Sequence, residues 1–331
     1  MDKGAYYIGV DLGGTSLTAA VIDVNDGQIL GESKRKTRSE LGALNVVDRM
    51  AKAISKAITN AGLKRQDIQG VGVGVPGPID PLSGTVIRCA NMGATWDQFE
   101  LGSILSELIN LPIVVDNDVH VGAVGEYAFG AGKGVSDLVA IFVGTGVGGG
   151  IIWHGKLHTG ARNSAGEVGH MVIAADIGPV CGCGERGCAE ALCSRTAMER
   201  EIRAAIAAGQ ASVISQLLQE SGRSELSAGI IGNAYDAGDA VTIAAVSQAQ
   251  HYLGLLIASC VNLIDPQAIV VGGGVLERMG DAYLVPVRLA AQQHYINKTD
   301  AAGIAIVRAA LGDYSGAIGA AVLANERLAS G

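Results

Sequence analysis

The chain has 331 residues, enough for about two domains. It is 49% hydrophobic and 17% charged, with only three Phe and two Trp, so its core must consist mainly of Ala, Val, Ile and Leu. The formal net charge is −8, and the basic run at residues 34–36 is short, as expected for a solvated strand end. Both observations argue against a nucleic-acid partner.

The first 120 residues have the pattern of several strands and an amphipathic helix. Apolar residues recur at helical spacing between Leu44 and Ile58, and Asn25-Asp26-Gly27 has the composition of a hairpin turn. A helix of small residues is expected after the last of these strands. The predicted strands span residues 6–11, 17–23, 28–30, 68–75 and 112–115.

The order of strand, glycine turn, strand, tight hairpin and strand recurs about 130 residues later, which indicates a duplicated domain. In this second copy, residues 144–150 form the predicted turn and His154-Gly155 the predicted hairpin. A helical region is expected at about 190–264 and a terminal helix from about Ser315. The predicted strands span residues 138–143, 151–153, 156–158, 268–271 and 304–307.

The longest uncharged stretch with a helical pattern covers residues 241–264. It contains Gln250, His251 and Asn262, which favour a buried or interface helix over a membrane span. The first residues show neither an apolar run nor a small-residue cleavage site. We therefore expect no membrane segment and a cytoplasmic protein.

Glycine turns follow strands at three places in the sequence. The G-x-G-x-x-G pattern at 144–149 is followed by a predicted strand and not by a helix, which excludes a dinucleotide-binding fingerprint, and no P-loop pattern is present. A single turn of this kind is an ordinary hairpin. Three such turns on a duplicated framework favour a nucleotide-binding site. The exposed N–H groups of the first two turns would then face the phosphates from opposite sides.

Asp11 lies at a strand end beside the first turn, where it could hold Mg²⁺ through water. The glycine run at 272–274 could accept the nucleoside. The predicted ATP and Mg²⁺ site comprises Asp11, Gly13, Gly14, Thr15, Ser16, Gly144, Thr145, Gly146, Gly148, Gly149, Gly273 and Gly274.

One histidine and three cysteines, His170, Cys181, Cys183 and Cys188, lie within a short segment. A Cys3His set suits tetrahedral zinc, and four protein ligands leave no open position, so the ion would be structural. The alternatives are a disulfide or inert buried thiols. The spacing and the lack of a secretory pattern favour zinc.

With these motifs the chain resembles the ROK family of bacterial sugar kinases and regulators, within the actin-like ATPase superfamily. The Cys/His segment is the most specific part of the resemblance, because the wider superfamily shares the glycine turns. The matching motifs are Asp11-Leu-Gly-Gly-Thr15, Asn117-Asp118, Gly144 to Gly150, Glu167-x-x-His170, Cys181-x-Cys183-x4-Cys188, Glu190 and Gly272-Gly-Gly274.

The resemblance implies two α/β domains of ribonuclease-H-like type around a cleft, with a zinc-binding loop. The smaller would comprise residues 1–120 plus 315–331, and the larger 121–314. Closing the cleft on a sugar would exclude water and limit wasteful ATP hydrolysis.

Asp118 follows a predicted strand end, where active-site loops of α/β proteins gather, and its carboxylate could take the proton of a sugar hydroxyl. The resemblance implies the same role for Asp118. It further implies sugar contacts, for which carboxylate, amide and imidazole groups are suited. The predicted sugar contacts are Asn117, Glu167, His170 and Glu190, with Gly77 and Asn91 as further contacts, although Asn91 could equally stabilise a turn.

Two positions depart from the family pattern. Ser16 stands where many relatives have Lys or Asn, so a phosphate contact there would be weaker or water-mediated. Val119-His120 stands where relatives commonly have Ala-Asn. We expect His120 to be structural, with a place in the pocket wall as the alternative. Asp116 is also expected to be a structural, hydrogen-bonded acid.

The resulting hypothesis is an ATP-dependent hexose kinase that converts glucose to glucose 6-phosphate, using Mg²⁺ and a structural zinc. N-acetylglucosamine, N-acetylmannosamine, mannose, fructose, allose or a cyclitol are alternative acceptors, and polyphosphate is an alternative donor. A sugar-sensing regulator would need a DNA-reading domain ahead of Asp11, and filament or chaperone ATPases lack the zinc loop. A homodimer or homotetramer through Ala-rich helices is expected, unless these helices are internal core.

Overall fold

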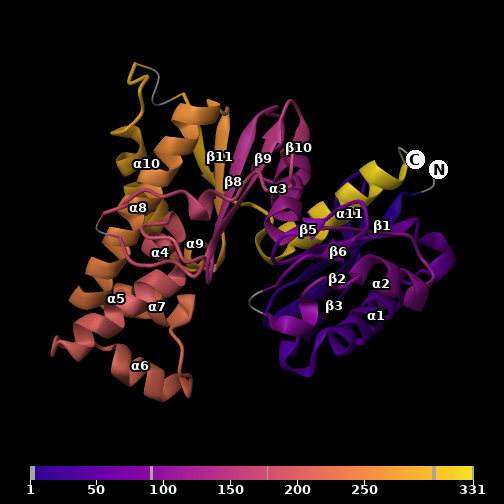
Figure 1. Ribbon diagram of the computed structural model, residues 1–331, viewed down its shortest axis with the longest axis horizontal. Helices are drawn as coiled ribbons and strands as arrows, with labels where there is room; N and C mark the ends of the chain where they lie inside the picture. Colours follow the sequence, from indigo (N-terminus) through magenta and orange to yellow (C-terminus); the bar gives the residue numbers. More distant parts are fainter. Residues whose placement is uncertain (1–3, 90–91, 177, 300–302, 330–331) are drawn as a thin grey trace. The chain divides into compact units, whose positions relative to one another are not determined.

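The computed structural model describes residues 4–89, 92–176, 178–299 and 303–329. Asn91, predicted as a sugar contact, therefore lies outside the described residues. Contact density divides the chain into two compact units (Figure 1). The first comprises Met1–Ser136, Gly150–Gly166 and Ala310–Gly331, and the second comprises Asp137–Gly149 and Glu167–Ala309.

In place of the expected boundaries at 120 and 315, the first unit extends to Ser136 and resumes at Ala310, with the terminal helix in the first unit as expected. Helix α3 (Asp118–Phe129) packs against helix α11 (Ser315–Ala329), so both belong to the first unit. A second difference is the segment Gly150–Gly166, which also belongs to the first unit. Its backbone is joined there by the N–H of Gly155, which donates to the carbonyl of Ser136 at 2.8 Å.

The first unit contains a five-stranded sheet in the order β3-β2-β1-β4-β7. Strand β1 runs antiparallel to β2 and parallel to β4, which in turn runs parallel to β7. The strands are β1 (Tyr6–Leu12), β2 (Ser16–Asp23), β3 (Gln28–Lys36), β4 (Gly70–Val75) and β7 (Ile113–Asn117), with a small separate hairpin of β5 (Ile79–Asp80) and β6 (Thr85–Val86). The strands predicted from the sequence are thus confirmed, except that β3 continues six residues beyond Leu30, as a partly exposed and therefore polar edge.

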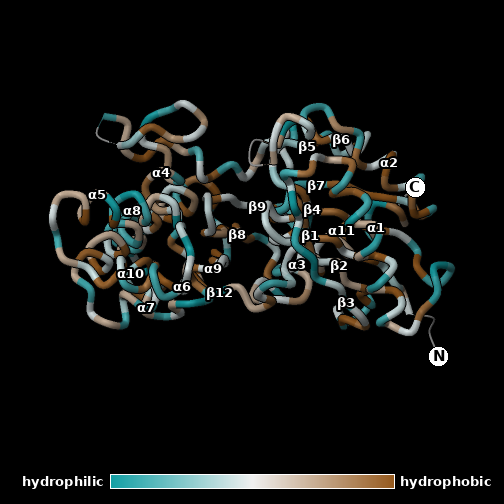
Figure 2. The backbone as a smooth tube through the Cα atoms, turned by 90° about the horizontal axis from the view of Figure 1, so that it is seen from below, coloured by the Kyte–Doolittle hydropathy of each residue, from teal (hydrophilic) through white to brown (hydrophobic). Residues whose placement is uncertain are grey.

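Helices cover both faces of this sheet, and side chains alternate between them along each strand. On one face Ile8 and Val10 belong to a core with α1 (Ala43–Asn60) and α2 (Leu101–Ile109). On the other face Tyr7 packs with α11. In Figure 2 the brown, apolar stretches of this unit follow the strands and α11.

The approach of α11 to the sheet is close enough to require glycine. A Cβ at Gly9 would overlap the carbonyl of Ala317, and a Cβ at Gly72 would overlap that of Ala320. Figure 1 shows α11, in yellow, lying across the strands. The helix is therefore pressed directly onto β1 and β4, which fixes the strand that carries Asp11.

The second sheet has the order β10-β9-β8-β11-β12, which repeats the order of the first. Strands β8, β11 and β12 are parallel neighbours, as β1, β4 and β7 are. The predicted duplication is therefore confirmed. The strands are β8 (Leu138–Val143), β9 (Val147–Trp153), β10 (Lys156–His158), β11 (Ala268–Gly272) and β12 (Ala305–Arg308).

The predicted tight hairpin is also confirmed, because Trp153 pairs with Lys156 across His154 and Gly155, which both have positive φ angles of 50° and 76°. The predicted turn at 144–150 is wrong in length, because β9 begins at Val147 and includes Gly148, Gly149 and Gly150. Strands are recognised in a sequence from the pattern of their side chains, and three successive glycines give no such pattern. At Gly150 the missing side chain leaves room for the carbonyl of Val119, which a Cβ would meet at 3.1 Å.

The helical region expected at 190–264 is confirmed, and it forms a large part of the second unit. Helix α8 is long and apolar enough to span a membrane, but 56% of its apolar window is buried within the protein. Its Gln250 side chain donates to the carbonyls of Ala282 and Tyr283, so α8 is a core helix packed on α10. The helices are α4 (Ala189–Cys193), α5 (Arg195–Ala207), α6 (Ile214–Ser221), α7 (Ala228–Asp236), α8 (Ala240–Ile264), α9 (Gly274–Met279) and α10 (Asp281–Gln292).

Candidate active site

The corner between β7 and α3 presents Asp118, the predicted base. Asn117 caps α3, because its side-chain oxygen accepts from the N–H groups of Val119 at 3.0 Å and His120 at 3.3 Å. Its amide nitrogen donates to the carbonyl of Gly77 at 3.0 Å. Asp118 is therefore the first residue of α3, where the helix dipole favours a negative charge.

The amide nitrogen of Asn117 carries two N–H groups, and it donates to the carbonyl of Gly77. The same hydrogen bond brings Gly77, another predicted sugar contact, to the N-terminus of α3. Gly77 has a φ of 99°, and a Cβ there would overlap the carbonyl of Arg88. Gly77, Asn117 and Asp118 thus form one corner of the first unit.

Asp11, at the end of β1, shares this corner. Burial, together with the negative charges of Asp118 and Asp313, raises the pKa of Asp11 to about 7. The carboxylates are therefore close enough to repel one another. A divalent cation at this position would offset the repulsion and favour the ionised form of Asp11.

Beneath the corner, Asp116 lies in a buried ionic network. Its carboxylate accepts from the backbone N–H of Asn117 at 2.7 Å, from Nδ1 of His120 at 2.8 Å, and from the guanidinium of Arg327. Burial alone would raise the pKa of Asp116, but the hydrogen bond from His120 and the charge of Arg327 hold it below its usual value. The expectation that Asp116 is structural is confirmed.

His120 belongs to the same network, and the expectation that it is structural is confirmed. Its Nε2 faces the carbonyl of Ala165 at 2.9 Å, while its Nδ1 faces Asp116. The ring of His120 is thus held between a carboxylate and a backbone carbonyl. His120 therefore connects α3 to the segment just before Glu167.

We expect Asp116→Asn to destabilise the protein by about 3 kcal/mol at pH 7, because it leaves Arg327 and His120 without their anionic partner. The folded-state pKa of Asp116 is depressed, so its contribution is present above the unfolded pKa of about 3.9 and is lost as the pH falls through the folded value. Urea unfolding at several pH values measures both effects.

The control is Asp48→Asn, which removes an exposed ion pair with Lys52 on α1 and should cost less than about 1 kcal/mol. The role of Asp116 would be contradicted if Asp116→Asn and Asp48→Asn lowered the free energy of unfolding equally at pH 7. It would also be contradicted if the difference between the two variants grew towards acid pH.

In the second unit, His170, Cys181, Cys183 and Cys188 converge, with their ligand atoms all within 4.8 Å of one another. Nδ1 of His170 lies 3.7 Å from Sγ of Cys181, and the sulfurs of Cys183 and Cys188 are also 3.7 Å apart. Bonds of about 2.3 Å to a tetrahedral zinc would place two sulfurs about 3.8 Å apart. The donor set therefore fits zinc.

The backbone brings the four ligands together in two steps. Val172 and Cys188 form a β-bridge that places His170 beside the last cysteine. Within the loop, the N–H of Cys181 donates to the carbonyl of Glu185 at 2.7 Å. Burial raises the pKa of Cys188 to about 12, so without a cation this thiol is neutral, and a bound metal would reverse that preference.

Glu190 connects this cluster with the second glycine turn. One carboxylate oxygen accepts from the N–H of Val147 at 3.0 Å, and the other lies 3.7 Å from Sγ of Cys181. Glu167 and His170 are exposed at either end of a short 3-10 helix, η5 (Val168–His170). Asp118 belongs to the first unit and these three predicted sugar contacts to the second.

The third glycine run separates β11 from α9. Gly272 ends the strand, Gly273 has a φ of 98°, and Gly274 begins the helix. A Cβ at Gly273 would overlap the carbonyl of Val143, at the end of β8. This run therefore lies beside the second glycine turn in the same unit.

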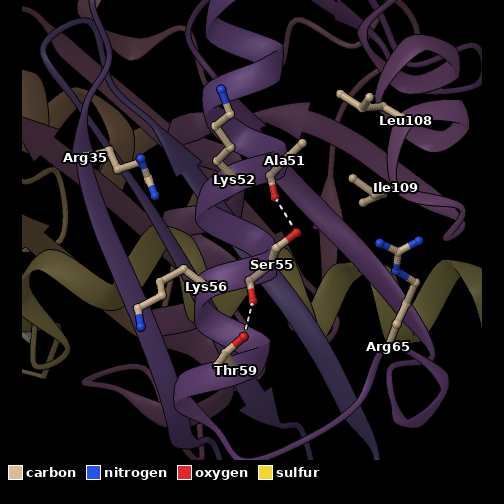
Figure 3. Close-up of a pocket in the computed structure, with 9 residues that line it drawn as sticks. All are labelled: Arg35, Ala51, Lys52, Ser55, Lys56, Thr59, Arg65, Leu108 and Ile109. Atoms are coloured by element: carbon tan, nitrogen blue, oxygen red, sulfur yellow. Dashed lines mark hydrogen bonds between the residues drawn. The ribbon is translucent and has the colours of Figure 1, made fainter.

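A hollow of about 420 Å³ lies elsewhere in the first unit, beside α1 (Figure 3). The hydroxyls of Ser55 and Thr59 bond to carbonyls of their own helix. None of the predicted site residues lines this hollow, and we do not assign the active site to it. It is lined by Arg35, Ala51, Lys52, Ser55, Lys56, Thr59, Arg65, Leu108 and Ile109.

The family model of the ROK family matches residues 7–327. A glucokinase of Halalkalibacterium halodurans is 33% identical, over 97% of this chain and 96% of its own. A xylose repressor of Caldicellulosiruptor bescii is 32% identical, over 80% of this chain and 65% of its own. The crystal structure of a ROK family glucokinase from Streptomyces griseus with glucose and AMPPNP superposes with a TM-score of 0.84 and 34% identity, over 97% of this chain and 99% of that one.

The duplicated α/β fold, of the actin-like ATPase type, and these relatives define an ATP-dependent sugar kinase of the glucokinase-like class. The match over residues 7–327 covers almost the whole chain. The chain belongs to the ROK family, and the resemblance stated from its motifs is confirmed.

Proposed function

We propose that the protein transfers the γ-phosphoryl group of ATP to the 6-hydroxyl of a hexose, with glucose as the preferred acceptor. The observation that carries this proposal is the β7–α3 corner, where Asn117 holds Asp118 at a helix N-terminus beside Asp11. A carboxylate at such a position is suited to take a proton from a hydroxyl. The glucokinase names of similar proteins support glucose.

In the proposed reaction, Asp118 takes the proton of the sugar hydroxyl while the hydroxyl oxygen forms a bond to the γ-phosphorus. The bond between this phosphorus and the bridging oxygen breaks, and ADP leaves. Asn117, Glu167, His170 and Glu190 would hold the other sugar hydroxyls. Asp11 would hold Mg²⁺ through water, and the ion would supply positive charge to the phosphates.

The Cys3His cluster would hold a structural zinc through Nδ1 of His170 and three thiolates. Four protein ligands fill a tetrahedral shell, so the cluster would order its loop and take no part in phosphoryl transfer. The Nε2 of His170 would then remain available to a sugar hydroxyl. This arrangement supports a role for the metal loop in substrate binding.

The test is ADP release by the purified protein with Mg-ATP across glucose, mannose, fructose, allose, N-acetylglucosamine, N-acetylmannosamine and cyclitols, each compared with a reaction lacking sugar. Turnover with glucose at the highest kcat/KM is expected, and mass analysis of the product should find one added phosphoryl group. A second series with polyphosphate in place of ATP tests the donor.

A sugar-sensing regulator is the second candidate, because a xylose repressor is among the similar proteins. Stabilisation by sugar in a thermal shift assay without any turnover would favour this candidate and contradict the kinase. Preference for an N-acetylhexosamine or cyclitol would retain the kinase and change its acceptor.

We also propose a cytoplasmic homodimer or homotetramer. Apolar side chains at the ends of α8 and α10 support assembly, since Leu263 is 77% exposed and Leu289 58% exposed. Covering these side chains would remove apolar surface from water.

A further inference from the structure

The carbonyl groups of the first glycine turn, residues 13–16, are occupied by donors from within the protein. The hydroxyl of Thr37 donates to the carbonyl of Gly13 at 2.6 Å, and the N–H of Thr37 donates to that of Thr15 at 2.9 Å. The N–H of Gly13 donates to Ser16 at 2.9 Å. Thr37 is fully buried, so these bonds are shielded from water.

The backbone N–H groups in the middle of this turn, in contrast to its carbonyls, have no acceptor among the residues that the structure describes. In the described part of the chain, no protein acceptor is found for the N–H groups of Gly14 and Thr15. Thr15 is exposed. The carbonyls of Gly13 and Thr15 are therefore bound within the protein, whereas the N–H groups of Gly14 and Thr15 remain for a ligand.

The second glycine turn, residues 144–146, has the same arrangement. The hydroxyl of Thr196 donates to the carbonyl of Thr145 at 2.7 Å, and the N–H of Arg195 donates to that of Gly144 at 2.9 Å. The carbonyl of Gly146 accepts from the N–H of Gly144 at 2.9 Å. Among the described residues, the N–H groups of Thr145 and Gly146 find no protein acceptor.

Arg195 also fixes the side chain of Thr145. Its Nη2 donates to the hydroxyl oxygen of Thr145 at 3.2 Å, while its Nη1 donates to the carbonyl of Leu226 at 2.6 Å. The hydroxyl of Thr145 accepts from Arg195, so its own hydrogen is free to point elsewhere. The donors of the second turn thus include a hydroxyl as well as two N–H groups.

A phosphate is bound by N–H and O–H groups and repelled by carbonyl oxygens. A glycine turn is flexible, and a rotated peptide would present its carbonyl to the ligand. We propose that Thr37 and Thr196 are positioning residues for the phosphates of the donor, because their hydroxyls hold the turn carbonyls away from the phosphates. This inference rests on the proposed transfer of phosphate from ATP and on the phosphate contacts that the sequence predicts for the two turns.

The test replaces each threonine by valine, which is similar in shape but lacks the hydroxyl. Thr37→Val and Thr196→Val should each raise the KM for ATP about tenfold, while the KM for the sugar changes less than about twofold. Thr37→Ser and Thr196→Ser keep the hydroxyl and should restore the KM for ATP. Thr196 is exposed, so its replacement is expected to leave folding intact.

Thr59→Val is the matched control, because the hydroxyl of Thr59 binds a carbonyl of α1 and no glycine turn (Figure 3). Its KM for ATP should equal that of the wild type. An unchanged KM for ATP in both Thr37→Val and Thr196→Val, or an equal rise in the KM values for ATP and sugar, would overturn the inference.

Calorimetric binding of AMPPNP separates this inference from the proposed function. A wild type that binds AMPPNP but phosphorylates no sugar would contradict the kinase, whereas weaker AMPPNP binding in the valine variants would still support the positioning role. A wild type that binds no AMPPNP at all would overturn the inference as well.

Discussion

Replacing Asp118 by Asn should lower kcat by about 10³-fold while the protein still binds sugar and ATP. The change removes the carboxylate that would accept the hydroxyl proton, but it leaves the Asn117 cap and its bond to Gly77 in place. Asp118→Ala should lower kcat at least as far. The measurement is kcat from ADP release, together with calorimetric binding of the preferred sugar.

Asp116→Asn is the contrasting variant, because it should lower the free energy of unfolding far more than Asp118→Asn does. A kcat for Asp118→Asn within about threefold of the wild type would exclude Asp118 as the base. A loss of sugar binding equal to the loss of kcat would instead make Asp118 a binding residue, since a base acts only in the transition state.

Replacing Cys183 by Ala should remove zinc from the purified protein and raise the KM for the sugar by about 10- to 100-fold. Three ligands would remain, and the loop that carries His170 and contacts Glu190 would lose its order. The measurement is zinc content by mass spectrometry, with KM values for sugar and ATP measured on the same preparation.

Cys260→Ala is the matched control, because Cys260 is a buried cysteine of α8 outside the cluster. It should keep one zinc per chain and a normal KM for the sugar. Undiminished activity in a metal-free preparation, or equal zinc loss in Cys260→Ala, would refute the role of the cluster.

The sequence predicts those features of this fold that depend on local pattern. Strands, the His154-Gly155 hairpin and the duplication all follow from residues close together in the chain. The convergence of His170 with the three cysteines is also predicted, because a short glycine-rich segment can bring them together. Occupancy by zinc stays a prediction, as do the roles of the site residues.

Contacts between distant segments could not be predicted in this way. Thr37 and Thr196 hold glycine turns by tertiary hydrogen bonds, and nothing in their neighbouring sequence indicates this. The same holds for Arg327, whose partner Asp116 lies 211 residues away. For Arg195, next to Thr196, the sequence offers only a positive charge as a signal.

The place of α11 in the first unit has a consequence for biosynthesis. This helix packs directly on Gly9 and Gly72 of the first sheet, yet the ribosome makes it after the whole of the second unit. During translation one face of that sheet is therefore uncovered until Ala317 and Ala320 emerge. The first unit therefore completes its core only after the second unit has been synthesised. Until then, its apolar face is exposed and prone to aggregation.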